Sequence, residues 1–259
     1  MNNRSNRSSK TSRPRERTQE ILFGINPITE AIRAGRRKIF QIIHKEGLQG
    51  APAASLISLA RTKGIQVTIA PMEKIVALAG ADGSQGIVAM VSPPVYSSFD
   101  KLLDQLAAMD NPKVTALDGV MDPRNLGAII RSAEAFGLAA VIFPERRAAG
   151  YTAVAAKASA GAGEHMRLCP VVNVGEALRL LRKEGFSCVA LEGTSEEEMG
   201  SPPTGSVVVV LGGEGTGLRP LVTKRCGRSV RIPMTGRVGS LNVSAAAAIA
   251  FHWVASGRG

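Results

Sequence analysis

The chain has 259 residues, of which 44% are hydrophobic and 20% charged. It can therefore bury the core of one large or two ordinary domains, and wholesale disorder is excluded. The 32 lysines and arginines exceed the 21 aspartates and glutamates, and the net charge of +11 favours RNA or DNA as a partner, although a soluble protein can also simply be basic. Aromatic residues make up only 4%, which argues against a module that binds single strands by stacking alone.

Neither a metal site nor a disulfide framework is indicated. The cysteines and histidines are scattered, without CxxC pairs or metal-ligand spacing, at Cys169, Cys188, Cys226, His44, His165 and His252. We interpret the cysteines as small buried residues in a reducing cytosol. The longest apolar run, residues 243–255, is too short to span a bilayer, and the N-terminus lacks the apolar block of a signal peptide. We expect a cytoplasmic protein that contacts no membrane and holds no metal.

The first residues form a basic tail, predicted as 1–19. The stretch MNNRSNRSSKTSRPRERTQE holds six basic and two acidic residues and almost nothing to bury, so we expect it to be disordered. Two interpretations stay open: an arm that binds phosphates nonspecifically, or a leader that keeps the protein soluble.

Helix and strand patterns then alternate through a small α/β domain, predicted as 20–92. Asn26 and Pro27 indicate the start of a helix that Gly35 ends, because glycine favours the residue after a helix. Further patterns predict strands at 38–44, 65–69 and 86–91, a helix from Pro52 to Gly64, and a helix that begins at Pro71.

Ser92-Pro93-Pro94 interrupts this pattern and predicts a linker over 93–110 with a short helix at 99–109. A second α/β domain follows over 111–259, with strands at 114–118, 140–143, 187–191 and 206–211 and helices at 125–136, 152–159, 174–183 and 242–255. Asn173 and Glu176 form a capping box for the third of these helices. Valine-rich strands between helices predict a mostly parallel sheet covered on both faces, with ligands bound beyond the carboxyl ends of its strands.

Three segments of the second domain could carry chemistry. The first, 117–137, runs from a strand through a polar turn into a helix that contains Asn125 and Arg131. These residues are six positions apart and do not share a helical face. Without a catalytic role, Asn125 would cap the helix and Arg131 would form a surface ion pair, for which Glu134 is three positions away.

The second segment, 207–218, carries a strand into a loop with four glycines in six residues, where the backbone can approach a ligand closely. The loop lacks GxGxxG spacing, and Glu214, its one charged residue, could be an ordinary surface carboxylate. The third segment, 230–254, leads through a short strand and a loop to Ser240 and Asn242, either of which could cap the alanine-rich helix that follows.

Taken together and in this order, the three segments resemble the signature motifs of the SpoU branch of the SPOUT methyltransferases. The matching stretches are NLGAIIRSA (125–133), LGGEGTGL (211–218) and IPMTGRVGSLNVS (232–244). Upstream, FGINPITEAI (23–32) is similar to the small RNA-binding domain of that family. The chain most resembles the bacterial 23S rRNA (guanosine-2′-O)-methyltransferases.

The resemblance implies an S-adenosylmethionine-dependent methyltransferase that acts on the 2′-oxygen of RNA ribose, most of all a guanosine of large-subunit rRNA. It implies a C-terminal SPOUT domain whose α/β fold ends in a deep trefoil knot, and a homodimer with active sites at the subunit interface. The methyl donor would bind in the knot, at Gly193, Gly212, Ile232, Met234 and Leu241. No metal is required.

The resemblance also assigns catalytic roles, with Arg131 matching the catalytic arginine of the family. A guanidinium keeps its proton, so we expect Arg131 to bind the target phosphate or ribose oxygen and to stabilise the developing alkoxide. Asn125 and Glu214 would orient the substrate and the arginine. Ser240 and Asn242 would shape the floor of the pocket.

The sequence is also compatible with other functions. A ribose methyltransferase of tRNA, or a resistance methylase of another rRNA site, would use the same residues, although the additional N-terminal domain favours rRNA. A noncatalytic RNA-binding protein of the same fold would not need all five reactive positions. A dehydrogenase-type nucleotide binder lacks its glycine fingerprint. The sequence does not reveal which nucleotide is methylated.

Overall fold

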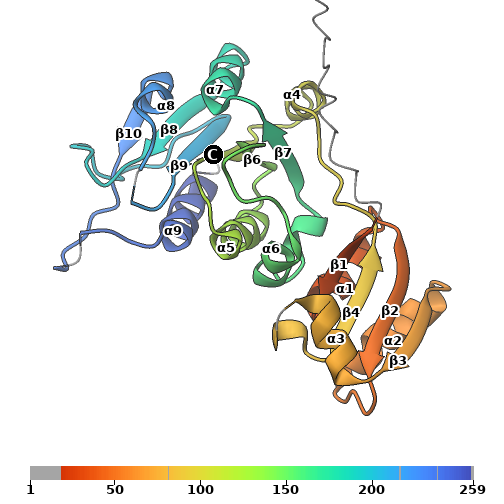
Figure 1. Cartoon of the computed structure of the whole chain (residues 1–259). Helices are drawn as coiled ribbons and strands as arrows, with labels where there is room; N and C mark the ends of the chain where they lie inside the picture. The colour runs from red at the N-terminus through yellow and green to blue at the C-terminus, as the bar shows by residue number, and fades with distance from the viewer. Residues whose placement is uncertain (1–18, 81, 216, 238, 258–259) are drawn as a thin grey trace, which may run out of the picture.

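The computed structural model describes residues 19–80, 82–215, 217–237 and 239–257 and contains two β-sheets, each with its own helices (Figure 1). Residues 1–18 of the predicted basic tail lie outside the described residues. No helix in the described ranges is long and apolar enough to cross a membrane.

The smaller sheet has four strands in the order β1-β4-β2-β3. β4 pairs antiparallel with β1 and β2, and β3 pairs parallel with β2. Its strands are β1 (Glu20–Phe23), β2 (Ile39–Lys45), β3 (Gln66–Ala70) and β4 (Ile87–Val91). Its helices are α1 (Ile25–Ala34), α2 (Ala51–Thr62), α3 (Met72–Ala79) and the short 3-10 helix η1 (Asp82–Ser84). Gly35 adopts the left-handed conformation that ends α1, as the sequence predicted.

The segment between the sheets contains the predicted helix, α4 (Phe99–Ala107). Leu102 and Leu106 are fully buried against the larger sheet, where they pack with strand residues such as Val114. α4 is thus part of a core as well as of the connection.

The larger sheet has six strands in the order β10-β8-β9-β5-β6-β7, and the pairs between neighbouring strands are parallel. Its strands are β5 (Lys113–Asp118), β6 (Ala140–Pro144), β7 (Arg167–Val171), β8 (Ser187–Leu191), β9 (Val207–Gly212) and β10 (Arg228–Val230). Its helices are α5 (Pro123–Ala135), α6 (Ala153–Ala158), α7 (Val174–Lys183), α8 (Pro220–Arg225), α9 (Val243–Ser256) and the 3-10 helix η2 (Ala162–Glu164).

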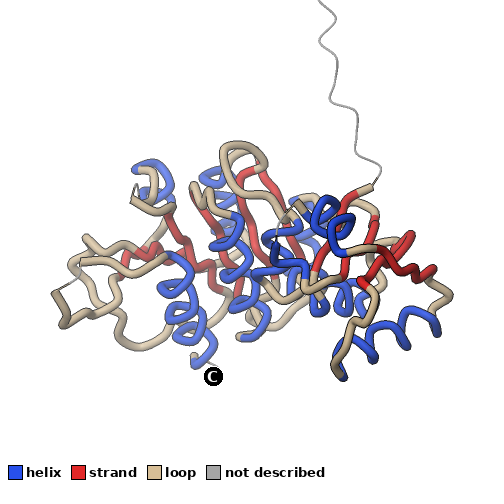
Figure 2. The backbone as a smooth tube through the Cα atoms, turned by 60° about the horizontal axis from the view of Figure 1, so that its bottom comes forward, coloured by secondary structure: helices blue, strands red, loops and turns tan. Residues whose placement is uncertain are grey.

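Both faces of this sheet are covered, which confirms the predicted architecture (Figure 2). Alternate residues of β9 point to opposite faces: Val207, Val209 and Leu211 pack with α5, α6 and α9, while Val208 and Val210 pack with α4, α7 and α8. The long valine run is therefore a strand buried on two sides.

Besides the short 3-10 helices η1 and η2, three elements of the fold were not predicted. β1 and α8 contain only four and six residues, too few to show a period. β7 contains Pro170, which argues against a central strand, but β7 is the edge strand of its sheet and pairs only with β6 among the described strands.

The cysteines are free thiols, and Cys169 and Cys188 are buried as predicted, whereas Cys226 is half-buried. Burial raises the pKa of the Cys169 and Cys188 thiols to about 11 and that of Cys226 to about 12. All three therefore stay protonated at neutral pH.

Candidate active site

The three segments singled out by the sequence meet at one edge of the larger sheet. β5 ends at Asp118 and β9 ends at Gly212, and these two residues lie side by side in the parallel register. The third segment follows β10 at the same edge and leads into α9, which packs on α5 and β9. This is the carboxyl edge of the sheet, where open α/β sheets bind their ligands.

Asn125, Glu214 and Asn242, one residue from each segment, form a hydrogen-bonded junction. The Asn125 Nδ2 donates to Glu214 Oε1 at 2.5 Å, and the Asn242 Nδ2 donates to the same oxygen at 2.8 Å. The Asn242 Nδ2 also donates to Asn125 Oδ1 at 3.1 Å. One carboxylate thus joins α5, the glycine-rich loop and the start of α9.

Asn242 is also the N-cap of α9, which was one of the two predicted caps. Its Oδ1 accepts from the backbone N–H of Ser244 at 2.8 Å and from the Ser244 hydroxyl at 2.6 Å. Because the oxygen caps the helix, the amide nitrogen is turned toward Glu214 and Asn125. The helix cap and the junction are two uses of one side chain.

Asp118 binds both ends of the glycine-rich loop, Gly213 through its backbone oxygen and Arg219 through its side chain. The sequence assigned no role to Asp118 or Arg219. The Asp118 side chain is 1% exposed, and it accepts from the Arg219 backbone N–H at 3.0 Å and from its Nε at 2.8 Å. This carboxylate raises the pKa of Arg219. The only signal was an aspartate at the end of a buried strand, and its partner lies 101 positions away.

The glycine-rich loop packs closely against the loop after β5. A Cβ added at Gly213 would lie 2.2 Å from the backbone oxygen of Gly119, and one added at Gly212 would lie 2.2 Å from the backbone carbon of Gly217. Glycine is needed at both positions because no side-chain movement could relieve contacts with backbone atoms.

We expect Gly213→Ala to lower the free energy of unfolding by about 1–3 kcal/mol, the usual effect of overpacking. Displacement of the loop would also move Glu214 out of the junction. The matched control is Gly150→Ala, since a Cβ there has nothing within 4 Å. Denaturant unfolding of both variants measures the free energy of unfolding. Equal stability of Gly213→Ala and Gly150→Ala would contradict the prediction, because the loop would then accommodate a Cβ at Gly213.

Arg131 and Ser240 lie outside the junction. Arg131 is exposed in the second half of α5 and forms no ion pair with any described residue, so the alternative pairing with Glu134 is wrong. Ser240 is exposed in the loop before α9. The alternative role of Asn125 as a helix cap is also wrong, since Asp122 caps α5.

The five residues predicted to hold the donor lie at the ends of β8, β9 and β10 or on the loops that follow, and these strands are neighbours in the sheet. Gly193 follows β8, Gly212 ends β9, and Ile232, Met234 and Leu241 lie between β10 and α9. Met234 and Leu241 are 40% and 42% exposed, large apolar side chains left open to solvent. Among the described residues, no group of three His, Cys, Asp or Glu could hold a metal ion.

Family models cover most of the chain. Residues 112–252 match the SpoU rRNA methylase family, and residues 21–97 match the RNA 2′-O ribose methyltransferase substrate-binding domain. The chain belongs to the SpoU rRNA methylase family.

Similar proteins include the 23S rRNA (guanosine-2′-O-)-methyltransferase RlmB of a Burkholderia species, 37% identical over 89% of this chain and 93% of that protein. RlmB of Escherichia coli K12 is 33% identical over 89% of this chain and 95% of that protein. Among solved structures, the AdoMet-bound rRNA methyltransferase of Sinorhizobium meliloti has a TM-score of 0.76 at 22% identity, covering 93% of this chain and 88% of the other.

The SpoU family match spans all three motifs, so the junction of Asn125, Glu214 and Asn242 lies within the family domain. The match to the substrate-binding domain contains the whole four-stranded sheet except Glu20.

Proposed function

We propose that this SpoU-family protein transfers a methyl group from S-adenosylmethionine to the 2′-oxygen of a guanosine ribose in 23S rRNA. The observation that carries the proposal is the junction of Asn125, Glu214 and Asn242, which joins the three motifs at the carboxyl edge of the sheet. Relatives named for this reaction, at 33% and 37% identity over 89% of the chain, support the substrate.

The chain's residues have three tasks in this reaction. A ribose hydroxyl holds its proton far above pH 7, so the enzyme must stabilise the oxygen as the proton leaves, and align it with the methyl group. Arg131 binds the target phosphate or ribose oxygen and stabilises the negative charge. Asn125 and Glu214 orient the substrate and the arginine, and Ser240 and Asn242 form the pocket floor. No metal is needed.

The proposed donor site comprises Gly193, Gly212, Ile232, Met234 and Leu241. S-adenosylmethionine, when bound, supplies an activated methyl group on a sulfonium. The open space around Gly193 and the exposed side chains of Met234 and Leu241 fit a flat, partly apolar group such as adenine. Backbone groups of these loops would hold its polar edge.

The proposed fold of the C-terminal part is a deep trefoil knot. Its support is the segment after β8, residues 197–200, which forms hydrogen bonds with residues before and after the loop of the third motif. Arg231 exchanges backbone hydrogen bonds with Glu197 and Met199, and Trp253 of α9 donates to the Gly200 oxygen at 2.8 Å. Residues on both sides of the third motif thus lie against the segment after β8, an arrangement that a knot in this part of the chain would require.

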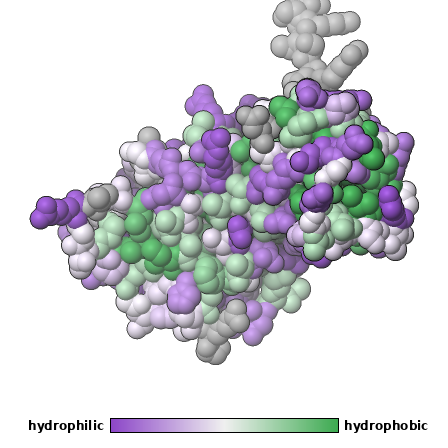
Figure 3. All heavy atoms as spheres, turned by 90° about the horizontal axis from the view of Figure 1, so that it is seen from below, coloured by the Kyte–Doolittle hydropathy of each residue, from purple (hydrophilic) through white to green (hydrophobic). Residues whose placement is uncertain are grey.

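We also propose a homodimer with active sites at the subunit interface. Arg131 is exposed and outside the junction of its own chain, so a second copy would be needed to complete a site around it. Met121 and Ile249 are large exposed apolar residues beside α5 and on α9, and hydrophobic residues gather around these helices on the face in Figure 3.

In this proposal residues 20–92 form the RNA-binding domain and residues 111–259 form the catalytic domain. Residues 93–110 link the two domains. The net charge of +11 supports a polyanionic substrate.

The substrate is tested with labelled S-adenosylmethionine and three RNA pools, from cells that lack the enzyme: large-subunit rRNA, small-subunit rRNA and tRNA. We expect label only in large-subunit rRNA, at one ribose that resists alkali. Label only in tRNA would support the proposed reaction but contradict 23S rRNA as its substrate. The absence of label in every pool, together with no donor binding, would favour a noncatalytic RNA-binding protein.

A further inference from the structure

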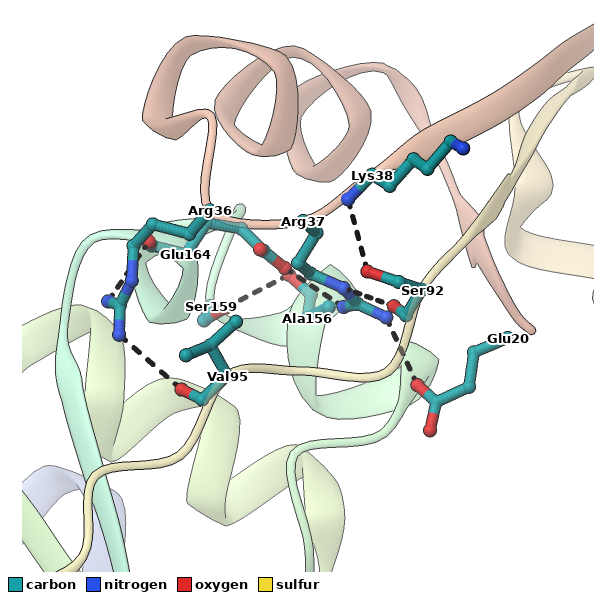
Figure 4. Close-up of polar contacts among 9 residues, drawn as sticks. All are labelled: Glu20, Arg36, Arg37, Lys38, Ser92, Val95, Ala156, Ser159 and Glu164. Carbon is teal, nitrogen blue, oxygen red and sulfur yellow. Dashed lines mark hydrogen bonds and ion pairs between the residues drawn. The ribbon is translucent and has the colours of Figure 1, made fainter. Parts of the chain in front are cut away.

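A buried ion pair joins the two sheets (Figure 4). Arg37 lies between α1 and β2 of the smaller unit, by which we mean the four-stranded sheet and its helices (residues 20–92). Glu164 ends η2 of the larger unit, the six-stranded sheet and its helices. The Arg37 guanidinium lies 3.2 Å from Glu164 Oε1, and both side chains are only 2% exposed. Charged side chains are almost never buried this far unless they are paired.

Arg37 is held from three directions. Besides Glu164, its guanidinium contacts Glu20 Oε2 of β1 at 3.1 Å, and its Nε donates to the Ser92 backbone oxygen at 2.7 Å. Two of these acceptors belong to the smaller unit, and the third belongs to the larger. The planar, forked guanidinium binds each acceptor through a different nitrogen, a spread of donors that the single nitrogen of a lysine does not offer.

Two neighbouring side chains, Arg36 and His165, reinforce this connection. Arg36 donates to the Met166 oxygen at 2.7 Å and to the Val95 oxygen at 3.4 Å. His165 Nε2 lies 2.9 Å from Glu30 Oε2 of α1. The surfaces also fit closely, because a Cβ added at Gly161 would lie 2.7 Å from the Cβ of Glu30.

The segment that receives Arg37 lies directly against the helix of the first motif. α6 and η2 pack on α5, and a Cβ added at Gly127 of α5 would lie 2.4 Å from the Ala155 oxygen. α5 carries both Asn125 and Arg131. A shift of the smaller unit against η2 would therefore change the orientation of the smaller unit relative to the active site.

We propose that Arg37 and Glu164 are positioning residues, a latch that fixes the RNA-binding unit relative to α5. The inference rests on the proposed function. It adds that this ion pair determines the single position in which bound RNA is presented to the active site. If the pair separated, Arg37 would keep Glu20, but Glu164 would lose its one ion-pair partner among the described residues, so one relative orientation is strongly favoured.

The test compares Arg37→Met and Glu164→Gln with the control Arg33→Met. Arg33 is near the end of α1, four positions before Arg37, and its side chain is 61% exposed in its ion pair with Glu30. Glu164→Gln keeps the size of the side chain but removes its negative charge, so it tests the latch should Arg37→Met fail to fold. Spin labels at the exposed positions Lys63 and Glu184, in a Cys226→Ser background, report the distance between the two units.

We expect a narrow distance distribution in the parent protein and in Arg33→Met, and a broad one in both latch variants. With large-subunit rRNA, KM should rise about tenfold in the latch variants while kcat changes less than about twofold, because only the docked fraction binds RNA productively. The affinity for S-adenosylmethionine should not change.

A narrow distribution with unchanged KM in Arg37→Met or Glu164→Gln would overturn the proposal. So would a fall in kcat at constant KM, which indicates a merely structural role. If the parent protein methylates no RNA, the proposed function fails, and the distance distributions still decide whether the latch exists.

Discussion

Arg131→Ala should lose methyl transfer, with kcat reduced at least about a hundredfold, while binding of S-adenosylmethionine and of RNA is retained. Removing one group that stabilises developing negative charge costs about 10²–10³ in rate. Arg131 is exposed and forms no ion pair with a described residue, so its replacement removes no contact that holds the fold. The stability of the protein should therefore be unchanged.

The measurement is single-turnover methyl transfer at saturating RNA, with thermal unfolding in parallel. Glu134→Ala is the matched control, since Glu134 is exposed on the same helix three positions further on. We expect full activity in this control. If Arg131→Ala kept parental activity, its assignment as the charge-stabilising group would be wrong.

Asn242→Ser should keep the stability of the protein and lose about a hundredfold in methyl transfer. The two functions of Asn242 use different atoms: its oxygen caps α9, and its amide nitrogen binds Glu214 and Asn125. Serine is as good an N-cap as asparagine but has no amide to donate to the junction. Small misplacements of catalytic groups cost about 10² in rate.

Asn242→Ala separates the two effects, because it removes the cap and the amide together. It should be as inactive as Asn242→Ser and also less stable, by about 1 kcal/mol. Unfolding by denaturant and single-turnover kinetics check both. Parental activity in Asn242→Ser would mean that Asn242 only caps the helix.

The sequence predicted most of the fold because long elements repeat their pattern. α5, α7 and α9 lie within two residues of their expected bounds, and the valine run of β9 has the expected two-sided burial. β1 and α8 were missed because four and six residues are too few for a hydrophobic pattern to repeat clearly. β7 was missed because an edge strand tolerates a proline that a central strand does not.

The site was predictable in its parts but not in its connections. The motif resemblance singled out Asn125, Glu214 and Asn242, and the structure brings them together. The pairing of Asp118 with Arg219 depends on side chains about a hundred positions apart, which no local pattern encodes. The roles of Arg131 and Ser240 remain predictions.

The ion pair between Arg37 and Glu164 was likewise not predictable from the local sequence. Charged residues near a helix end are normally solvated, and nothing in the local sequence distinguishes Arg37 from its exposed neighbour Lys38. Only the packing of η2 against the smaller unit buries Arg37 and gives it Glu164 as a partner.

The central claim is that the methyl group reaches a ribose oxygen, and the product nucleoside tests it most directly. Large-subunit rRNA methylated by the purified protein would be digested to nucleosides and analysed by mass spectrometry. The proposal predicts 2′-O-methylguanosine, with the additional mass on the ribose fragment. A methyl group on the base fragment would contradict the proposed chemistry, whichever RNA had carried the label.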